Sequence, residues 1–257
     1  MKSFLTLLLV LLCTLPGMAE MRETDDLKAL EPEVTATTLV CFDLDNTLIR
    51  TEQMLASDQW WDDLIYGFVA AGMPERDALR KAFETWLPIQ KQSRFIAVQP
   101  DGPTIVRAMQ DRKIMVMGLT ARPLLLASLT MAQLASISID LRLSQPFPDQ
   151  LEIKLAKDTA HYQNGILFAG AYSSKGEALK AFLDTTGLKP GKIVFADDQQ
   201  RHITAMEQVF GKGPIAYVGF RYGGADAWVK KYDRRIAEIQ QQYLGRILSD
   251  EAAAKLK

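Results

Sequence analysis

The chain has 257 residues, of which 48% are hydrophobic and 24% are charged, a composition typical of a globular protein with one sizeable domain. Its formal net charge of -1 excludes a bulk electrostatic attraction to nucleic acid or acidic lipid, so we expect no nucleic-acid partner. With only two histidines and two cysteines, the chain is not expected to hold a zinc site.

The first 19 residues have the layout of a secretory signal peptide. Lys2 gives a positive start, a short apolar run (FLTLLLVLLCTL) follows, and the small residues Gly17 and Ala19 end the segment. The apolar run of about a dozen residues is shorter than the roughly 20 that a membrane-spanning helix needs, so an uncleaved anchor is the weaker alternative. We therefore predict an exported protein, cleaved after Ala19, that is periplasmic or secreted and has no stable membrane span in its mature form.

The rest of the chain divides into three parts. Residues 20–36 are rich in charged side chains and predict a polar N-terminal arm. An apolar run over residues 37–42 predicts a buried strand. Residues 51–98 then show apolar residues at helical spacing, which predicts a helical insert after the first strand. The α/β core is therefore assigned to residues 37–50 and 99–257.

Strands alternate with helices after the insert. This alternation predicts an α/β fold with a mainly parallel sheet flanked by helices. The expected strands are 114–119, 137–144, 165–171, 192–196 and 214–220. The expected helices are 101–113, 124–136, 174–187 (ended by Gly187), 200–211 and 225–248. Whether residues 138–170 add a hairpin to the insert stays open.

Polar residues follow the predicted strands at their carboxyl ends, where ligand sites form in parallel sheets. Asp43 and Asp45 follow the first strand, and Thr120 follows a second one. The remaining members of the set are Asp197 and Asp198, after a third strand, and Lys175, beside a helix start. These segments deliver acids, a hydroxyl and an ammonium group to one edge of the sheet, which is the strongest functional signal in the chain.

This set of residues has a specific chemistry. Four carboxylates at one edge repel each other strongly unless a cation neutralises them, and oxygen ligands in a partly hydrated site favour Mg²⁺. The metal, Lys175 and Thr120 together suit a phosphoryl group, whose transfer needs mainly positioning and charge neutralisation. Asp43 is then a candidate nucleophile that forms an aspartyl-phosphate, and Asp45 is a candidate general acid and base.

Four short motifs, DLDNT, LTARP, SSKGEAL and VFADD, resemble in sequence and order the motifs of the haloacid dehalogenase (HAD) superfamily. The resemblance implies a HAD-type, Rossmann-like fold with a small helical cap inserted after the first strand. It implies that Asp43 is the nucleophile and a metal ligand. It also implies that Asp45 is the general acid and base and offers its backbone carbonyl to Mg²⁺. The other implied roles are phosphoryl binding by Thr120 and Lys175 and metal binding by Asp197 and, through water, Asp198.

Two positions refine the resemblance. Asp45, two residues after Asp43, makes the motif resemble that of the phosphatase and phosphotransferase branch, because dehalogenases lack a proton donor at this position. Leu44 departs from the P-type ATPases, which have lysine at this place. The stretches SDQWW and GFRYGG and the exported N-terminus are similar to an uncharacterised family of secreted bacterial HAD-like proteins. The resemblance implies an exported, Mg²⁺-dependent hydrolase of a small-molecule phosphate monoester.

Residues near the motifs are candidates for substrate contact, each with a structural alternative. Asp58 lines the entrance of the pocket or caps a helix. Trp60 is a second candidate, but Trp61 points about 100° away from it on a helix, so one of the two packs inside the insert while the other faces the pocket. Arg122 meets a substrate anion or forms a salt bridge that fixes its loop. Gln199 touches the substrate from a helix start.

Two other classes of protein compete with a phosphatase. A phospho-accepting receiver domain uses the same residue types around Mg²⁺, but its acid pair comes first in the chain, whereas Asp197 and Asp198 come last here. A non-catalytic periplasmic or surface binding protein on a HAD scaffold is the other alternative, because a complete set of residues does not prove activity. His202, close to the acid pair, is expected to be structural.

Overall fold

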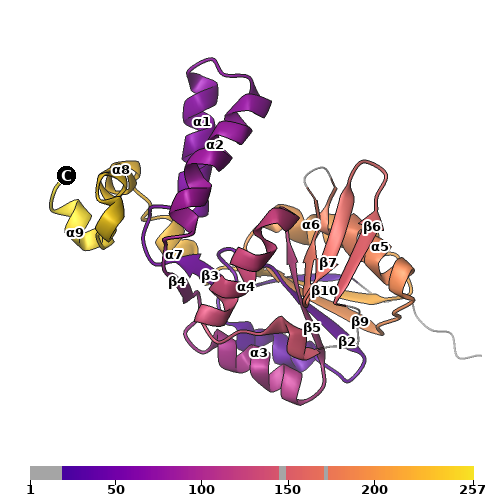
Figure 1. Cartoon of the computed structure of the whole chain (residues 1–257). Coiled ribbons are helices and arrows are strands. Elements are labelled where there is room, and N and C mark those ends of the chain that lie inside the picture. Colours follow the sequence, from indigo (N-terminus) through magenta and orange to yellow (C-terminus); the bar gives the residue numbers. More distant parts are fainter. Residues whose placement is uncertain (1–18, 145–148, 171–172) are drawn as a thin grey trace, which may run out of the picture.

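The computed structural model describes residues 19–144, 149–170 and 173–257, which form an α/β domain with a helical lobe (Figure 1). The signal peptide predicted over residues 1–19 lies outside this part of the chain, apart from Ala19. A large, mostly parallel sheet carries helices on both faces, so the predicted Rossmann-like α/β class is confirmed. Its strands are β1 Glu20–Thr24, β2 Thr38–Phe42, β5 Met115–Thr120, β6 Gln150–Lys154, β7 Thr159–Gln163, β8 Ile166–Phe168, β9 Lys192–Asp197 and β10 Ala216–Tyr222.

Strand β2 lies near the middle of the sheet, whose order is β1-β10-β9-β2-β5-β8-β7-β6. It pairs in parallel with β9 on one side and with β5 on the other. The chain continues to one side of β2 through β5 and β8 and later to the other side through β9 and β10. The strand order therefore reverses at β2, and ligands of open α/β sheets bind beside the carboxyl ends of the strands at such a point.

The sheet is buried on both faces. Because side chains alternate across a strand, Val40 and Phe42 of β2 join one hydrophobic cluster, whereas Leu39 and Cys41 join the other. The first cluster lies between the sheet and the helices α3 Gly102–Asp111 and α4 Ala127–Ser136, and the second lies between the sheet and the helices α5 Lys175–Thr186 and α6 Gln200–Phe210.

Helix α5 ends where the sequence predicts. Gly187, with a φ of 70°, ends this helix in the left-handed conformation.

Residues 20–36 correct the prediction of a polar arm. The segment starts with β1, which pairs in parallel with β10 at the edge of the sheet. It continues into the 3-10 helix η1 (Leu27–Glu33), where Leu27 and Leu30 are fully buried in the core. Two leucines three positions apart are too few to produce an apolar period, and the edge strand exposes charged side chains. Residues 20–36 therefore belong to the fold, although their composition does not indicate it.

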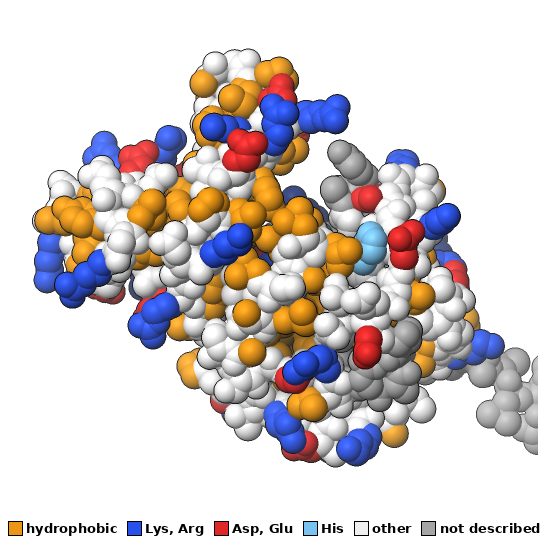
Figure 2. Space-filling view, in the orientation of Figure 1, with side chains coloured by type: hydrophobic (Ala, Val, Ile, Leu, Met, Phe, Trp, Pro, Cys, Tyr) orange, Lys and Arg blue, Asp and Glu red, His pale blue; other side chains and the backbone are white. Residues whose placement is uncertain are grey.

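Helices α1 and α2 project from the domain as an antiparallel pair, which we call the lobe (Figure 1). Hydrophobic side chains gather on the visible face where the lobe meets the domain (Figure 2). The Ser57 hydroxyl accepts the backbone N–H of Trp60 and caps α1, so the alternative role of Asp58 as the helix cap is wrong. The lobe comprises α1 Asp58–Ala70 and α2 Glu75–Gln90, between the paired strands β3 Ile49–Thr51 and β4 Phe95–Ala97.

The segment between α4 and α5 extends the main sheet. Strands β6 and β7 form an antiparallel hairpin, and β7 pairs with β8. The strand predicted over residues 137–144 is wrong, because this stretch contains the 3-10 helix η3 (Leu141–Ser144). Ile139 and Leu141 are buried there by packing in the first hydrophobic cluster and not by pairing with a strand. Another short 3-10 helix, η2 (Leu124–Leu126), precedes α4.

The C-terminal segment is broken into short helices, so the prediction of one long helix over residues 225–248 is wrong. Asp233 is extended, with a φ of -134°, and accepts the backbone N–H of Arg235, which starts a new helix. The pieces are α7 Asp226–Val229, α8 Arg234–Gln242, η4 Leu244–Arg246 and α9 Asp250–Ala254. No helix in the described ranges combines the length and the apolar character needed to cross a membrane.

Helix α8 packs against the base of the lobe. Ile236 and Ala237 join the hydrophobic cluster that contains Trp60. The fully buried Gln240 side chain accepts the backbone N–H of Leu55 at 2.9 Å. The C-terminal helices therefore hold the position where the chain enters the lobe.

Candidate active site

Three neighbouring strands deliver the predicted residues to one edge of the sheet. Asp43 follows β2, and its backbone N–H donates to the carbonyl of Ala196 in β9 at 2.9 Å. Thr120 is the last residue of β5, and Asp197 is the last residue of β9. Because β9, β2 and β5 are adjacent and parallel, their carboxyl ends lie side by side.

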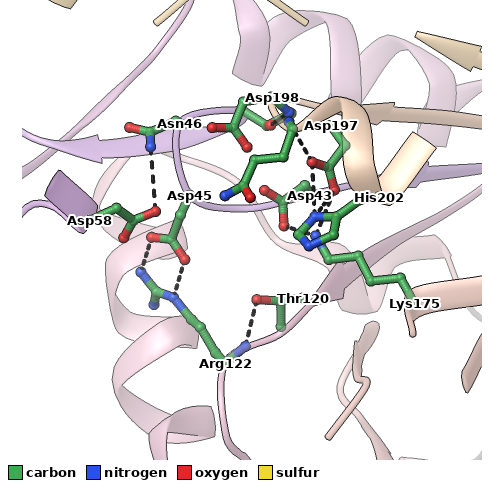
Figure 3. Close-up of polar contacts among 12 residues, drawn as sticks. Asp43, Asp45, Asn46, Asp58, Thr120, Arg122, Lys175, Asp197, Asp198 and His202 are labelled. Atoms are coloured by element: carbon green, nitrogen blue, oxygen red, sulfur yellow. Dashed lines mark hydrogen bonds and ion pairs between the residues drawn. The ribbon is translucent and has the colours of Figure 1, made fainter. Parts of the chain in front are cut away.

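A buried ion-pair network centres on Lys175. Its Nζ donates to Asp43 Oδ1 and, at 2.7 Å, to Asp197 Oδ2 (Figure 3). The three side chains are only 2%, 8% and 0% exposed. Lys175 is the first residue of α5, whose start is fixed by a capping box between Ser174 and Glu177. The motif SSKGEAL thus places the ammonium group by local hydrogen bonding.

An acidic cluster lies beside Lys175. One carboxylate oxygen each of Asp43, Asp197 and Asp198 lies within 4.8 Å of the others. The backbone N–H of Asp198 donates to the buried Thr47 hydroxyl at 3.1 Å. The Oδ1 atom of Asp198, in contrast, is buried without a hydrogen-bond partner among the described residues. An orphaned carboxylate oxygen in such a cluster suits a hard cation, so these residues could hold a metal ion. The Asp45 carboxylate is not part of the cluster.

Burial and neighbouring charges set the protonation of this cluster. Burial raises the pKa of Asp43 well above its usual value, although Lys175 opposes this. Burial, with the added charge of Asp197, raises the pKa of Asp198 to about 7. Burial acts on Asp197 in the same direction, but Lys175 and His202 outweigh it and leave its pKa below the usual value. Three carboxylates thus face the ammonium group of Lys175, and burial favours the protonated forms of Asp43 and Asp198 but not of Asp197.

Asp45 is held by Arg122. The Nε and Nη2 atoms of Arg122 donate to Asp45 Oδ2 and Oδ1 at 2.7 and 2.6 Å, which makes a bidentate ion pair (Figure 3). Nη1 of Arg122 donates to the hydroxyl of Thr130 at 3.0 Å. Of the two alternatives for Arg122, the structure has the salt bridge that fixes its loop.

A chain of buried hydrogen bonds continues from Arg122 to the lobe. Nη1 also donates to Gln133 Oε1 at 2.6 Å. Gln133 Nε2 donates to Gln90 Oε1 at 2.9 Å, and Gln90 Nε2 donates to the carbonyl of Ala56 at 2.6 Å. Gln90 is the last residue of α2 and Ala56 lies just before α1. These hydrogen bonds therefore connect Asp45 to the two points where the polypeptide enters and leaves the lobe.

Thr120 offers a hydroxyl to the same space. Its Oγ1 accepts the backbone N–H of Arg122 at 3.1 Å. In the described part of the chain, its proton has no acceptor, so the hydroxyl can donate to a ligand. Thr120 and Lys175 line one pocket together with Asp43 and Asp45.

This pocket, of about 440 Å³, lies between the edge of the sheet and the lobe. Asp58, Arg122 and Gln199, three of the four residues predicted to contact substrate, line it. Trp60 does not: its side chain is 3% exposed and packs in the hydrophobic cluster at the base of the lobe. Trp61 lines the pocket instead. The choice of Trp60 is wrong, and the expectation that the two tryptophans face different surroundings is confirmed.

Two further residues take part in the site although no role in it was predicted for them. His202 Nδ1 lies 3.0 Å from Asp197 Oδ2, and the side chain lines the pocket. Its place in the first turn of α6, five residues after Asp197, is the signal that indicates this contact. Asn46, with a φ of 57°, turns the chain after Asp45 and donates to Asp58 Oδ2 at 3.4 Å. Asparagine tolerates this left-handed conformation better than most residues do.

Over residues 21–254 the chain matches a family described as "Protein of unknown function (DUF2608)". The chain belongs to this family. A Chlamydia pneumoniae relative named "Putative outer membrane protein" is 30% identical over 214 residues, which cover 83% of this chain and 80% of the relative. A Chlamydia trachomatis relative of the same name is 26% identical over 215 residues, which cover 84% of this chain and 80% of the relative. No solved structure matches the chain.

The family match covers all residues that line the pocket. Every residue of the site, from Asp43 to His202, lies inside the matched range 21–254. The sheet, the lobe and the C-terminal helices α7, α8, η4 and α9 also lie within it, apart from the first residue of β1. The pocket is therefore built from the DUF2608 family region alone.

Proposed function

We propose that the protein is an exported, Mg²⁺-dependent phosphatase of the HAD superfamily that hydrolyses a small-molecule phosphate monoester through an aspartyl-phosphate on Asp43. One observation carries this proposal: the buried contact of Lys175 with Asp43 and Asp197 at adjacent strand ends, beside the orphaned Oδ1 of Asp198. Phosphoryl transfer requires positioning and charge neutralisation, and these groups can supply both.

Asp43 is the nucleophile in this mechanism. Its Oδ1 accepts a hydrogen bond from Lys175, which fixes the carboxylate, and its other oxygen attacks phosphorus. The bond from phosphorus to the leaving oxygen breaks as the bond to Asp43 forms. Lys175 and the hydroxyl of Thr120 line the same pocket and bind the phosphoryl oxygens.

Asp45 handles the protons. Asp45 must first take up a proton, which releases one of its two hydrogen bonds from Arg122, and it then donates this proton to the leaving oxygen. The resulting carboxylate takes a proton from the water that attacks the aspartyl-phosphate, which releases phosphate and restores the Asp43 carboxylate. The two hydrogen bonds from Arg122 restrict the rotation of Asp45, so its carboxylate is oriented before the substrate binds.

The donor set of the acidic cluster suits Mg²⁺. Asp43, Asp197 and Asp198 would hold the ion, and the carboxylates outnumber the single ammonium group of Lys175. When bound, Mg²⁺ supplies positive charge that stabilises the phosphoryl oxygens during transfer.

Export is the second part of the proposal. It is supported by the signal-like N-terminus and by the name "Putative outer membrane protein" of the chlamydial relatives. Cleavage after Ala19 would leave Glu20, the first residue of β1, as the new N-terminus. Mass spectrometry of protein recovered from the periplasm or the medium should find a chain that starts at Glu20, and an intact N-terminus would contradict cleavage.

A phosphate-ester panel with and without millimolar Mg²⁺ tests the activity. We expect Mg²⁺-dependent hydrolysis, and Asp43→Asn should lower kcat by at least about 10³-fold, because it removes the nucleophile. Asp184→Asn, on the exposed face of α5, is the matched control and should leave kcat unchanged. If no ester is hydrolysed, or if Asp43→Asn equals the wild type, the proposal is wrong and the non-catalytic binding protein is the better interpretation.

A further inference from the structure

The pocket has two unlike sides. One side is the charged edge of the sheet, and another is formed by Trp61 of α1 with Phe83 and Trp86 of α2, which we call the aromatic wall. The groups proposed to transfer the phosphoryl group all belong to the charged edge. The aromatic wall therefore faces the part of the substrate that leaves.

The rings of the aromatic wall differ in burial. Trp61 and Trp86 meet with their centroids 5.6 Å apart and an interplanar angle of 68°, and Trp61 and Phe83 meet at 6.5 Å and 86°. Trp86 is 6% exposed, whereas Trp61 and Phe83 are only half-buried. Trp86 thus anchors the group inside the lobe, and the other two rings keep surface on which a ligand can pack.

Two buried polar atoms belong to side chains of the lobe. Oε1 of Gln59, an acceptor, and Nε1 of Trp86, a donor, have no hydrogen-bond partner among the residues that the structure describes. Both residues line the pocket. Buried polar atoms without a partner are rare in folded proteins, and an absent ligand is one explanation for them. A ligand edge that carries both a donor and an acceptor would satisfy this pair once the side chains adjust to it.

The charges on this side favour a neutral group. Asp58 and Asp62 line the pocket, with Arg201 close to Asp62 and with Asp45 and Arg122 close to Asp58. These three acids and two cations leave no spare positive charge for a second anionic group on the leaving part of the substrate.

We propose that the leaving group is a neutral, planar aromatic ring with a hydrogen-bond donor and acceptor on its edge, such as a nucleobase carried on a sugar phosphate, and that it packs on Trp61 and Phe83. This inference rests on the proposed phosphatase function. The hydroxyls of a sugar or polyol alone could bond to the two polar atoms, but they would leave the aromatic surface without a planar stacking partner.

Two esters with the same scissile bond test the inference. Adenosine 5′-monophosphate and ribose 5-phosphate release the same primary alcohol oxygen, so their intrinsic reactivity is matched and only the ring differs. We expect kcat/KM to be at least about tenfold higher for the nucleotide, which is the size of effect that one stacked ring produces. Equal kcat/KM values would overturn the inference.

Variants of the aromatic wall locate the effect. Trp61→Ala should lower kcat/KM far more for the nucleotide than for ribose 5-phosphate and so reduce the nucleotide preference to near one, and Trp61→Phe should keep most of the preference. Trp86→Phe retains a ring but removes the N–H, and it should lower the preference by about threefold or more. Tyr66 lies on α1, the helix of Trp61, and is 72% exposed. Tyr66→Ala is therefore the control and should keep the full nucleotide preference. A loss of rate that is equal for both esters would overturn the assignment of Trp61.

Binding measurements separate this inference from the proposed function. The Asp43→Asn protein can be titrated with both esters while its tryptophan fluorescence is followed. If nothing is hydrolysed but the nucleotide binds at least about tenfold more tightly, the phosphatase proposal fails and the ring site stands. If both esters are hydrolysed without preference, the ring site fails and the phosphatase stands. If neither ester binds or reacts, both are overturned.

Discussion

The charged edge of the sheet and the aromatic wall of the lobe line one pocket but are stabilised in different ways. At the edge, buried hydrogen bonds hold most of the acidic and basic groups: Lys175 contacts two acids and Arg122 contacts Asp45, whereas Oδ1 of Asp198 has no partner among the described residues. On the lobe, rings pack on one another, while polar atoms of Gln59 and Trp86 have no partner in the described part of the chain. The edge is thus organised before a ligand binds, whereas the lobe has unmet hydrogen-bonding capacity that a ligand can use.

The largest effect on stability is expected at Lys175. Lys175→Met leaves the buried carboxylates of Asp43 and Asp197 without their counter-ion, and breaking a buried pair in this way costs about 3–5 kcal/mol. We expect the free energy of unfolding to fall by about that amount in EDTA and by less in Mg²⁺, as measured by urea unfolding. Lys180→Met, on the exposed face of the same helix, should cost less than about 1 kcal/mol. Equal losses for the two variants would contradict the comparison.

The second-largest effect is expected at Arg122, where rates with two esters distinguish a loss of Asp45 positioning from a loss of fold stability. Arg122→Lys keeps the charge but cannot form the bidentate pair with Asp45. An alkyl phosphate, whose alcohol needs a proton, should lose about 10²-fold in kcat, whereas p-nitrophenyl phosphate, whose leaving group needs none, should lose about threefold or less. Steady-state rates with both esters measure this, and Arg107→Lys on the exposed face of α3 is the control. An equal loss on both esters would show that the substitution only loosens the fold.

A smaller effect concerns metal affinity at Asp198. Asp198→Asn removes the charge of the carboxylate whose Oδ1 has no protein partner among the described residues. The Mg²⁺ concentration for half-maximal activity should rise about 10–100-fold, the usual cost of losing a group that supports a metal site. An activity titration with Mg²⁺ gives this value, with Asp184→Asn as the control. An unchanged Mg²⁺ requirement would place the ion elsewhere.

The smallest effect is a pH dependence of the metal-free protein. Asp198 has a pKa of about 7 in the fold, compared with about 3.9 when unfolded, so the folded state binds the proton more tightly. Its contribution to stability is therefore complete below about pH 4 and is lost as the pH rises through about 7. Urea unfolding in EDTA should show a fall of about 1–2 kcal/mol over this interval, after allowance for solvent screening. Asp43, whose pKa is also raised by burial, acts with the same sign, and Asp197 acts with the opposite sign.

Mg²⁺ provides the counter-test of the pH effect. The ion binds the ionised carboxylates, so saturating Mg²⁺ should flatten the dependence, and Asp198→Asn should weaken it in EDTA. A stability that rises between about pH 4 and pH 7 in EDTA would contradict the protonation assigned to this cluster.

The edge of the sheet was predictable because its signals are local. A short apolar run followed by Asp43 marks the end of β2, and Ser174 with Glu177 marks the start of α5 beside Lys175. Parallel strands align their carboxyl ends, so residues far apart in the chain could be placed together before any contact was known. Their partners were less accessible, because the pairing of Asp45 with Arg122 depends on side-chain direction across two loops.

The sequence by itself determined the α/β class, the strand ends and the set of polar residues gathered there, because apolar period and capping act over a few residues. Only the tertiary structure decided that Trp61, and not Trp60, faces the pocket, since packing of α8 against the base of the lobe buries Trp60. It also decided that residues 20–36 belong to the fold, because an edge strand is defined by its pairing with β10 and not by its composition.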